Sequence, residues 1–490
     1  MRKQDQLQQL IHGLSANEKR YFKIFSSLKT GDKNYLKLFD QLGAYEQYDA
    51  QTIGRKIDKS KAALAHSKEH LKDVLLRALR SFNEDTFASS YYHRQLEEIE
   101  LLYSKEQLAW TFSKIEKTLN EALKEDAFQY VLMLLRWYHT VGFYVGKGSY
   151  MPEQINLEQK TLTALGNELQ YQHLLYRFNH LLNEQKEMVN SKTGNELKEL
   201  MRSPMLTNSK KPLSNSARIL FHRINGMYYL YVSLNKTKSE KHFIEALKIF
   251  KNNPLLFRAK ARVYCMMASG LINVYNSFEE YGKASKAIDD FEHTLATQKY
   301  FSKPNLVFGW NHVMLTRIYN LCYSNQYKKA IEYAEHVQQQ QHSIYKQLSV
   351  PNRTDFLFMT AISYWKTKGL KHALKISEQL IRTETTTNNI TLVNNRFLFL
   401  LIQFDLGHYT TLQYLLQNHI RWCRKEKLTG KKIVLFNKML QELCRTNDYK
   451  KHRMEVFKKY LPSFKNSEQS IEQRIFDTLE IADWIKEKTR

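Results

Sequence analysis

Glycine and proline are scarce in this sequence. Its 490 residues include 16 glycines and 7 prolines, together about 5% where average usage is about 12%. Because hairpin turns and the collagen repeat depend on these two residue types, the scarcity excludes an all-β or collagen-like chain. Apolar residues recur with helical periodicity along most of the chain, so we predict an all-α protein.

Cysteines and long apolar runs are also few. The four cysteines lie at least 21 residues apart, which excludes the CxxC spacing of redox and zinc sites. The first ten residues lead into no apolar stretch of a signal peptide. Apolar runs such as Phe397–Ile402 reach six residues, far short of the roughly 20 that span a bilayer. We therefore expect a soluble, cytoplasmic protein that has no membrane partner and needs no metal or cofactor.

Acidic residues are outnumbered, and the imbalance is uneven. The chain has 74 Lys and Arg against 49 Asp and Glu, a net charge of +25. By region the net charge is +7 for residues 1–80, −5 for 81–200, +24 for 201–460 and −1 for 461–490. Because a field of one sign attracts partners of the other, we expect any anion-binding surface to lie in the third region.

The N-terminal residues 1–82 predict a compact domain of four helices. A capping-box spacing begins one helix near Ser15. A second helix is expected over residues 34–43, where a glycine supplies the stop. Asp49 can cap a third, and residues 60–82 place their apolar side chains on one stripe of a fourth.

From residue 83 onward the pattern is one of paired helices. An early pair is expected over residues 91–104 and 107–124, with Leu101 and Trp110 among its apolar side chains. Further on, a small or apolar residue recurs at separations of 41, 43, 43 and 39 residues, at Ala246, Ala287, Ala330, Ala373 and Leu412. A period near 40 indicates stacked helix pairs. Small residues suit the point where two helices cross most closely.

Two stretches resemble the second helix of a tetratricopeptide repeat, namely residues 327–332 and 370–375. Gly407-His-Tyr409 resembles the turn into that helix, and Ala361 and Tyr364 fit the first helix of a unit. The resemblance spans residues 217–446 and, faintly, 87–200. It implies a right-handed α-solenoid with an extended concave binding surface. The layout also resembles a group of uncharacterised basic bacterial proteins that join an N-terminal helical domain to tetratricopeptide-like pairs.

These patterns divide the chain into five segments. A compact helical domain is expected over residues 1–82, followed by weakly repetitive helix pairs over 83–200. Clustered Ser, Asn, Lys and Pro residues predict a loop over 201–216. Tetratricopeptide-like repeats are expected over 217–464, and a C-terminal helix over 465–490 caps the last of them.

Two short motifs resemble catalytic sites. His66-Ser-Lys-Glu69-His70 has the HxxEH order of inverted zinc peptidases, and histidines four residues apart share a helix face. A third ligand is not evident, so a polar helix face is the preferred interpretation. Only three residues separate Gly142 from Gly146-Lys147, where a phosphate-binding loop has four. A connection between helices is favoured there, and we predict no enzymatic activity.

The cations of the third region are the remaining candidates for function. We predict a scaffold that binds an acidic protein or peptide through a basic repeat surface. The alternative is a regulatory protein that binds nucleic acid through the basic array or the N-terminal helices. Trp422 could then stack on an unpaired base. The candidate partner-binding residues are Lys210, Lys211, Arg218, Arg223, Arg421, Trp422, Arg424, Lys425, Lys427, Lys431 and Lys432.

Overall fold

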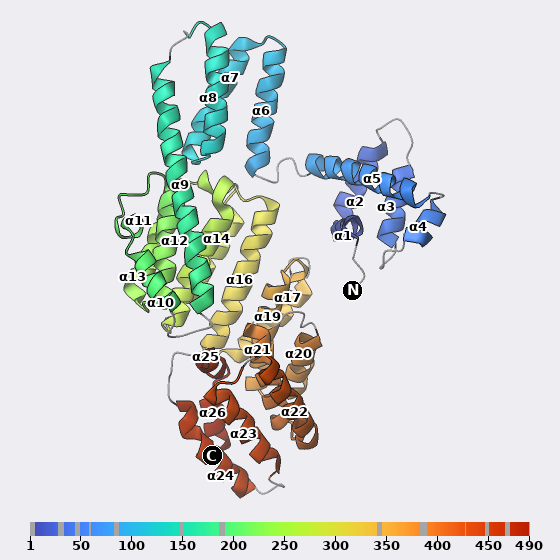
Figure 1. Cartoon of the computed structure of the whole chain (residues 1–490), viewed down its shortest axis with the longest axis vertical. Coiled ribbons are helices and arrows are strands. Elements are labelled where there is room, and N and C mark those ends of the chain that lie inside the picture. Colours follow the sequence, from blue (N-terminus) through green and yellow to red (C-terminus); the bar gives the residue numbers. More distant parts are fainter. Residues whose placement is uncertain are drawn as a thin grey trace. The chain divides into compact units, whose positions relative to one another are not determined.

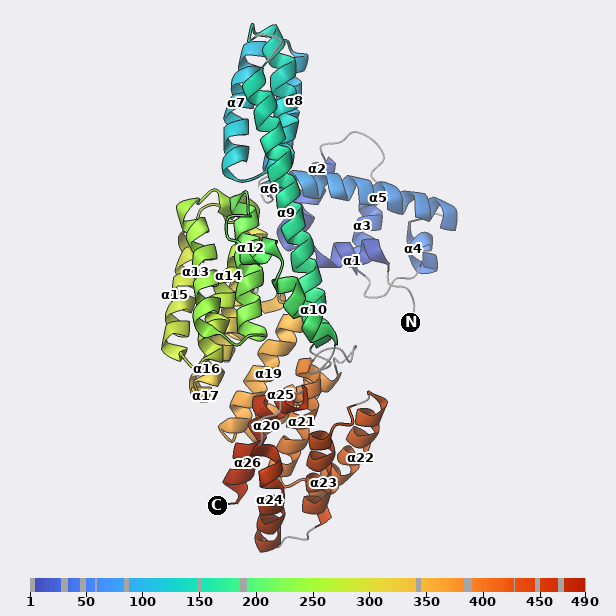
Figure 2. The same ribbon diagram turned by 60° about the vertical axis from the view of Figure 1, so that its left-hand side comes forward.

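The structure is a computed structural model, shown in Figures 1 and 2. It describes residues 5–27, 34–44, 50–57, 60–82, 88–147, 151–185, 192–340, 345–382, 390–426, 428–445, 450–465 and 471–489. These residues form 25 α-helices and no strand, which confirms the all-α prediction. The chain divides into two compact units, residues 1–105 and 106–490. Within the described residues, no helix is both long and apolar enough to cross a membrane.

The first unit is built around its longest helix, α5. The sequence predicted four helices in residues 1–82, and the structure has five. The additional helix is α1, where the Asp5 side chain accepts a hydrogen bond from the Gln8 N–H at 3.1 Å. The predicted capping box is present, because the Ser15 N–H donates to the Glu18 carboxylate at 2.8 Å. Asp49 lies outside the described residues. The helices are α1 (Gln6–Gly13), α2 (Ala16–Ser27), α3 (Asn34–Ala44), α4 (Ala50–Lys56), α5 (Lys61–Phe82) and α6 (Ala88–Ser104).

The second unit begins with helices α7 to α11. The 34-residue helix α9 contacts α8 near one end and α10 and α12 further along (Figure 2). Leu101 of α6 and Trp110 of α7, predicted to supply apolar faces, are instead 59% and 65% exposed. The segment 201–216, predicted as a loop, contains the short helix α11. These helices are α7 (Leu108–Lys124), α8 (Phe128–Tyr144), α9 (Pro152–Gln185), α10 (Lys192–Met201) and α11 (Pro204–Thr207).

From α12 onward the second unit repeats one packing arrangement. From α12 to α24 each helix contacts the next described helix, and α14, α16, α19 and α21 also contact one another in turn. This packing is compatible with a helical-repeat fold. The helices are α12 (Asn215–Tyr231), α13 (Lys236–Asn252), α14 (Leu256–Ser277), α15 (Tyr281–Thr297), α16 (Lys303–Tyr323), α17 (Tyr327–Gln340), α19 (Val350–Lys366), α20 (Leu370–Arg382), α21 (Ile390–Asp405), α22 (Tyr409–Lys425), α23 (Lys431–Arg445), α24 (Lys450–Lys465), α25 (Ile471–Thr478) and α26 (Ile481–Lys488).

Five of the turns between helices share one backbone geometry. A residue with φ between 51° and 76° lies two positions before the next helix, at Asp126, Glu279, Asn325, Lys368 and Gly407. The following N–H bonds to the carbonyl five residues back, as in Gln326 N–H to Leu321 O at 2.8 Å. This bond and the left-handed residue define a Schellman helix stop. Because four of the five residues are not glycine, the usual sequence signal of the stop is missing.

The close helix crossings use the fourth residue of each second helix. That residue is fully buried in α13, α15, α17, α20 and α22, where it is Ser239, Ala284, Ala330, Ala373 and Leu412. The residues aligned from the sequence, Ala330, Ala373 and Leu412, are therefore the crossing residues of α17, α20 and α22. In α13 the alignment named Ala246, which is buried but two turns further on. In α15 it named Ala287, which is only half-buried.

Part of the positive charge of the array is neutralised inside the second unit. Arg258 of α14 forms ion pairs with Glu121 and with Glu125, whose side chain is fully buried. Lys260 pairs with Glu168 of α9 at 2.8 Å. The acidic helices that precede residue 201 are thus held to the basic array by opposite charges.

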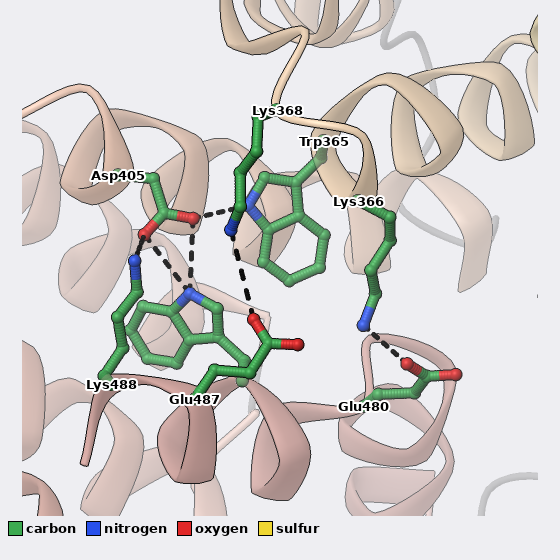
Figure 3. Close-up of polar contacts among 8 residues, drawn as sticks. Trp365, Lys366, Lys368, Asp405, Glu480, Glu487 and Lys488 are labelled. Atoms are coloured by element: carbon green, nitrogen blue, oxygen red, sulfur yellow. Dashed lines mark hydrogen bonds and ion pairs between the residues drawn. The ribbon is translucent and has the colours of Figure 1, made fainter. Parts of the chain in front are cut away.

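The C-terminal helix α26 is fastened to the array through Asp405 at the end of α21 (Figure 3). The Asp405 carboxylate accepts hydrogen bonds from the indole N–H groups of Trp365 at 2.8 Å and Trp484 at 3.3 Å. Lys488 lies 2.7 Å from the same carboxylate, whose side chain is 4% exposed. Lys366 and Glu480 form an adjoining ion pair. The two carboxylate oxygens of Asp405 therefore accept from both indole N–H groups and from the Lys488 ammonium.

Candidate functional site

A pocket of about 860 Å³ lies at the start of the basic array. Its walls come from α10, α11, α12 and α13, and we call it the α10–α13 pocket. Two of these helices begin with a side-chain cap, in which a side chain accepts a hydrogen bond from a backbone N–H. The Ser214 hydroxyl accepts from the Ala217 N–H at 3.0 Å, and Asn235 accepts from the Lys238 N–H at 3.0 Å. These caps fix where α12 and α13 start and so place their lining residues.

Four cationic side chains surround the opening of the pocket. Lys198 and Arg202 come from α10 and the residue just after it, and Lys238 and Lys241 come from α13. All four are exposed. Among the described residues, none of the four forms an ion pair. The one lining carboxylate, Glu245, pairs instead with Lys248 at 2.7 Å. The opening therefore carries an excess of positive charge.

Two half-buried histidines line the same pocket. His222 of α12 and His242 of α13 place their Nδ1 atoms 3.0 Å apart. Burial is the main cause that lowers the pKa of each imidazole to about 4. The nearby cations Arg218 and Lys241 add to the lowering at His222, and Glu245 opposes it. Both rings are neutral near pH 7.

Aromatic rings hold the histidine pair in place. The Tyr229 ring stacks on the His242 ring at a centroid distance of 5.7 Å and an interplanar angle of 15°. Phe221 presents its edge to both imidazoles, at 5.2 Å and 5.8 Å. The Lys238 ammonium lies over Tyr229, 5.2 Å from the ring centre. The pocket thus combines exposed cations with packed aromatic and imidazole rings in its lining.

The first predicted cation cluster lies beside this pocket and does not line it. Lys210, Lys211 and Arg218 are exposed, and Arg218 lines a separate shallow hollow with Leu213 and Ser214. Arg223 is half-buried, and burial lowers the pKa of its guanidinium. The structure therefore does not gather these four residues into one site.

The second predicted cluster is divided between surface and interior. Arg421, Arg424 and Lys425 of α22 and Lys431 of α23 are exposed. Lys432 is buried, with 7% of its surface accessible. The half-buried Trp422 is covered by the Arg396 guanidinium, 4.4 Å from the ring centre. Lys427 lies outside the described residues. Four exposed cations remain as a candidate surface.

The two motifs that resemble catalytic sites fall on ordinary helical positions. His66 and His70 are exposed on α5, and Glu69 pairs with Lys72. Among the described residues, no group of three or more His, Cys, Asp and Glu side chains could hold a metal ion. Gly142 belongs to α8, and Gly146 has a φ of 75° in the connection that follows.

Comparisons with protein-family models, with curated proteins and with solved structures find no match to this chain. The candidate residues predicted from the sequence include none of the side chains that line the pocket. His222 and His242 are 20 residues apart and belong to no local motif. The alternation of helices that brings them together was predicted, and the helix register that aims them at each other was not.

Proposed function

We propose that this protein is a nonenzymatic scaffold that binds an acidic segment of a partner protein at the α10–α13 pocket. The observation that carries the proposal is the set of four exposed cations around one cavity, none of which pairs with a carboxylate of the described residues. Elsewhere in the unit, cations such as Arg258 and Arg317 are matched by nearby carboxylates. Exposed charges arranged with one sign attract a partner of the opposite sign and orient it.

We further propose that the array from α12 to α24 is a right-handed solenoid of tetratricopeptide-like pairs. Three features support this assignment: the recurring left-handed stop before the second helix, the buried fourth residue of that helix, and the contacts between successive first helices. A solenoid presents an extended surface on which a peptide segment can lie. The pocket would then anchor one end of that segment.

Nucleic-acid binding is the second candidate function. The exposed cations Arg421, Arg424, Lys425 and Lys431 favour it, because a row of cations can neutralise successive phosphates. Trp422 gives it less support, since Arg396 already covers its ring. We rank it second because a confined pocket suits a side chain better than a duplex backbone.

The test is fluorescence anisotropy of a labelled poly-glutamate peptide with full-length protein. We expect Lys238→Glu combined with Lys241→Glu to weaken binding at least about tenfold, because like charges then oppose the peptide. The matched control is Arg421→Glu with Arg424→Glu, which we expect to change the affinity less than about twofold. The opposite ranking of the two variants would contradict the pocket assignment.

A pull-down from lysate, with and without nuclease, separates the two candidate functions. Partners of a protein-binding scaffold remain bound after nuclease treatment. They are lost when the variant Lys238→Glu with Lys241→Glu replaces the parent protein. Capture that depends on nucleic acid and on Arg421 would favour the second function.

A further inference from the structure

The His222–His242 pair can accept one proton without losing its mutual contact. Because the Nδ1 atoms lie 3.0 Å apart, one of them donates a hydrogen bond and the other accepts it. In this neutral pair one Nε2 bears a hydrogen and the other has a lone pair. A proton added at the lone pair leaves the Nδ1 contact intact and makes both Nε2 atoms donors. A second proton would place two N–H groups against each other.

Burial is the main cause that resists the first proton, and the surrounding cations add to it. Arg218 lowers the pKa of His222, Lys238 lowers that of His242, Lys241 lowers both, and Glu245 raises both. Lys198 and Arg202 add two further cations to the same pocket from the α10 side. An anion that enters among these groups removes the repulsion and favours the imidazolium form. Anion binding and proton uptake are thereby coupled.

The amount of charge identifies the class of anion. A carboxylate would neutralise one of the four exposed cations, Lys198, Arg202, Lys238 and Lys241. A phosphomonoester carries about −1.5 to −2 charges near pH 7 and three strong acceptor oxygens. Those oxygens match two imidazole donors and the flanking ammonium groups. A cavity of about 860 Å³ admits a phosphorylated side chain together with its attachment to a peptide.

We propose, building on the function above, that the α10–α13 pocket receives a phosphorylated side chain of the acidic partner segment. The His222–His242 pair takes up one proton as the phosphoryl group binds. The affinity for a dianion that does not itself titrate therefore rises as the pH falls below neutrality.

Calorimetry with sulfate tests the proton uptake on the unmodified full-length chain. Sulfate is a tetrahedral dianion that does not titrate near neutral pH, so any proton taken up belongs to the protein. Titrations in two buffers of different ionisation enthalpy count that proton. We expect uptake approaching one proton per sulfate at about pH 6, and an affinity that rises up to about tenfold per unit fall in pH. Binding without proton uptake, or uptake of two protons, overturns the proposal.

A double variant locates the proton. We expect His222→Gln with His242→Gln to abolish proton uptake while the four cations still bind sulfate weakly. The matched control is His293→Gln, an exposed histidine on α15, which should leave the uptake unchanged. Undiminished uptake by the double variant overturns the assignment. If the double variant does not fold, the calorimetry on the unmodified chain still decides.

Peptides identify the ligand. We expect an acidic peptide with one phosphoserine to bind at least about tenfold more tightly than the same peptide with glutamate there, because a dianion forms more charge-assisted hydrogen bonds. Equal affinities overturn the phosphoryl assignment and leave the acidic-segment function standing. Free inorganic phosphate that binds as tightly as the phosphopeptide also overturns it. Sulfate binding with proton uptake but no peptide binding would contradict the proposed function instead.

Discussion

The cluster around Asp405 and the α10–α13 pocket use charged groups in opposite ways. At Asp405, two indole N–H groups and the Lys488 ammonium converge on one buried carboxylate. In the pocket, four cations face a cavity whose single carboxylate is already paired with Lys248. Matched charges fasten parts of the chain together, whereas unmatched charges leave binding capacity for another molecule. Pairing is therefore a better guide to function here than the number of cations.

The largest effect should come from the matched cluster. We expect Asp405→Ala to lower the free energy of unfolding by about 3–5 kcal/mol, because the donors of Trp365, Trp484 and Lys488 lose their acceptor. Chemical denaturation followed by circular dichroism measures it. The control is Asp483→Ala on α26, whose exposed pair with Lys486 contributes less than about 1 kcal/mol. Equal effects of the two changes would remove the distinction between matched and surface charges.

A substitution in α15 tests helix packing without changing any charge. We expect Ala284→Trp to lower the free energy of unfolding by at least about 2 kcal/mol, because it overfills a fully buried helix crossing. Ala287→Trp, one turn later and half-buried, should have a smaller effect. Thermal melts of both variants decide the register. A larger effect at Ala287 would restore the alignment made from sequence.

Acid should destabilise the protein through histidines that are held neutral. The pKa values of His222 and His242 are lowered to about 4, and that of the buried His419 to about 3, from an ordinary 6.5. Between these values the unfolded chain binds more protons than the folded one. Stability is therefore fully present above about pH 6.5 and falls as the pH decreases toward 4. Melting temperatures across this range, with and without sulfate, measure it.

In that experiment, sulfate distinguishes the histidines of the pocket from the buried His419. Sulfate should restore the stability that is lost at low pH through His222 and His242. It should leave unchanged the loss of stability through His419. In the variant His222→Gln with His242→Gln, sulfate should give no recovery specific to low pH. Equal recovery in that variant would show that sulfate acts elsewhere on the chain.

The smallest effect on stability should come from the unmatched cations. We expect Lys238→Gln to change the free energy of unfolding by less than about 0.5 kcal/mol, because no carboxylate in the described part of the chain pairs with its ammonium. The same substitution at Lys488 removes a charged partner of Asp405 and should cost about 1–3 kcal/mol. Denaturation curves for the pair of variants test the comparison directly. A large effect at Lys238 would show that its charge is structural.

The helical architecture was predictable because its causes are local. The capping box at Ser15 and the buried alanines Ala330 and Ala373 are visible in short windows of sequence. The stops at Glu279 and Lys368 were not visible, because residues that disfavour a left-handed backbone occupy them. The alignment nevertheless held at Ala373 and failed at Ala287, one turn after the buried Ala284.

The pocket was less predictable because its causes are distant along the chain. Charge counting pointed to the region that supplies three of the four cations of the pocket, but it gave equal weight to the buried Lys432 and the exposed Lys241. His222 and His242 acquire meaning only when α12 and α13 pack side by side. A single sequence shows that both histidines exist and shows nothing of their 3.0 Å separation.

The Asp405 cluster also provides an optical signal. Trp365 and Trp484 are 3% and 2% exposed, whereas Trp110 is 65% exposed. Fluorescence from the two buried indoles should lie at shorter wavelengths and resist quenching by iodide, while Trp110 is quenched readily. Detachment of α26 would admit water to both indoles and shift their emission to the red. The protein therefore reports the state of its C-terminal helix without any attached dye.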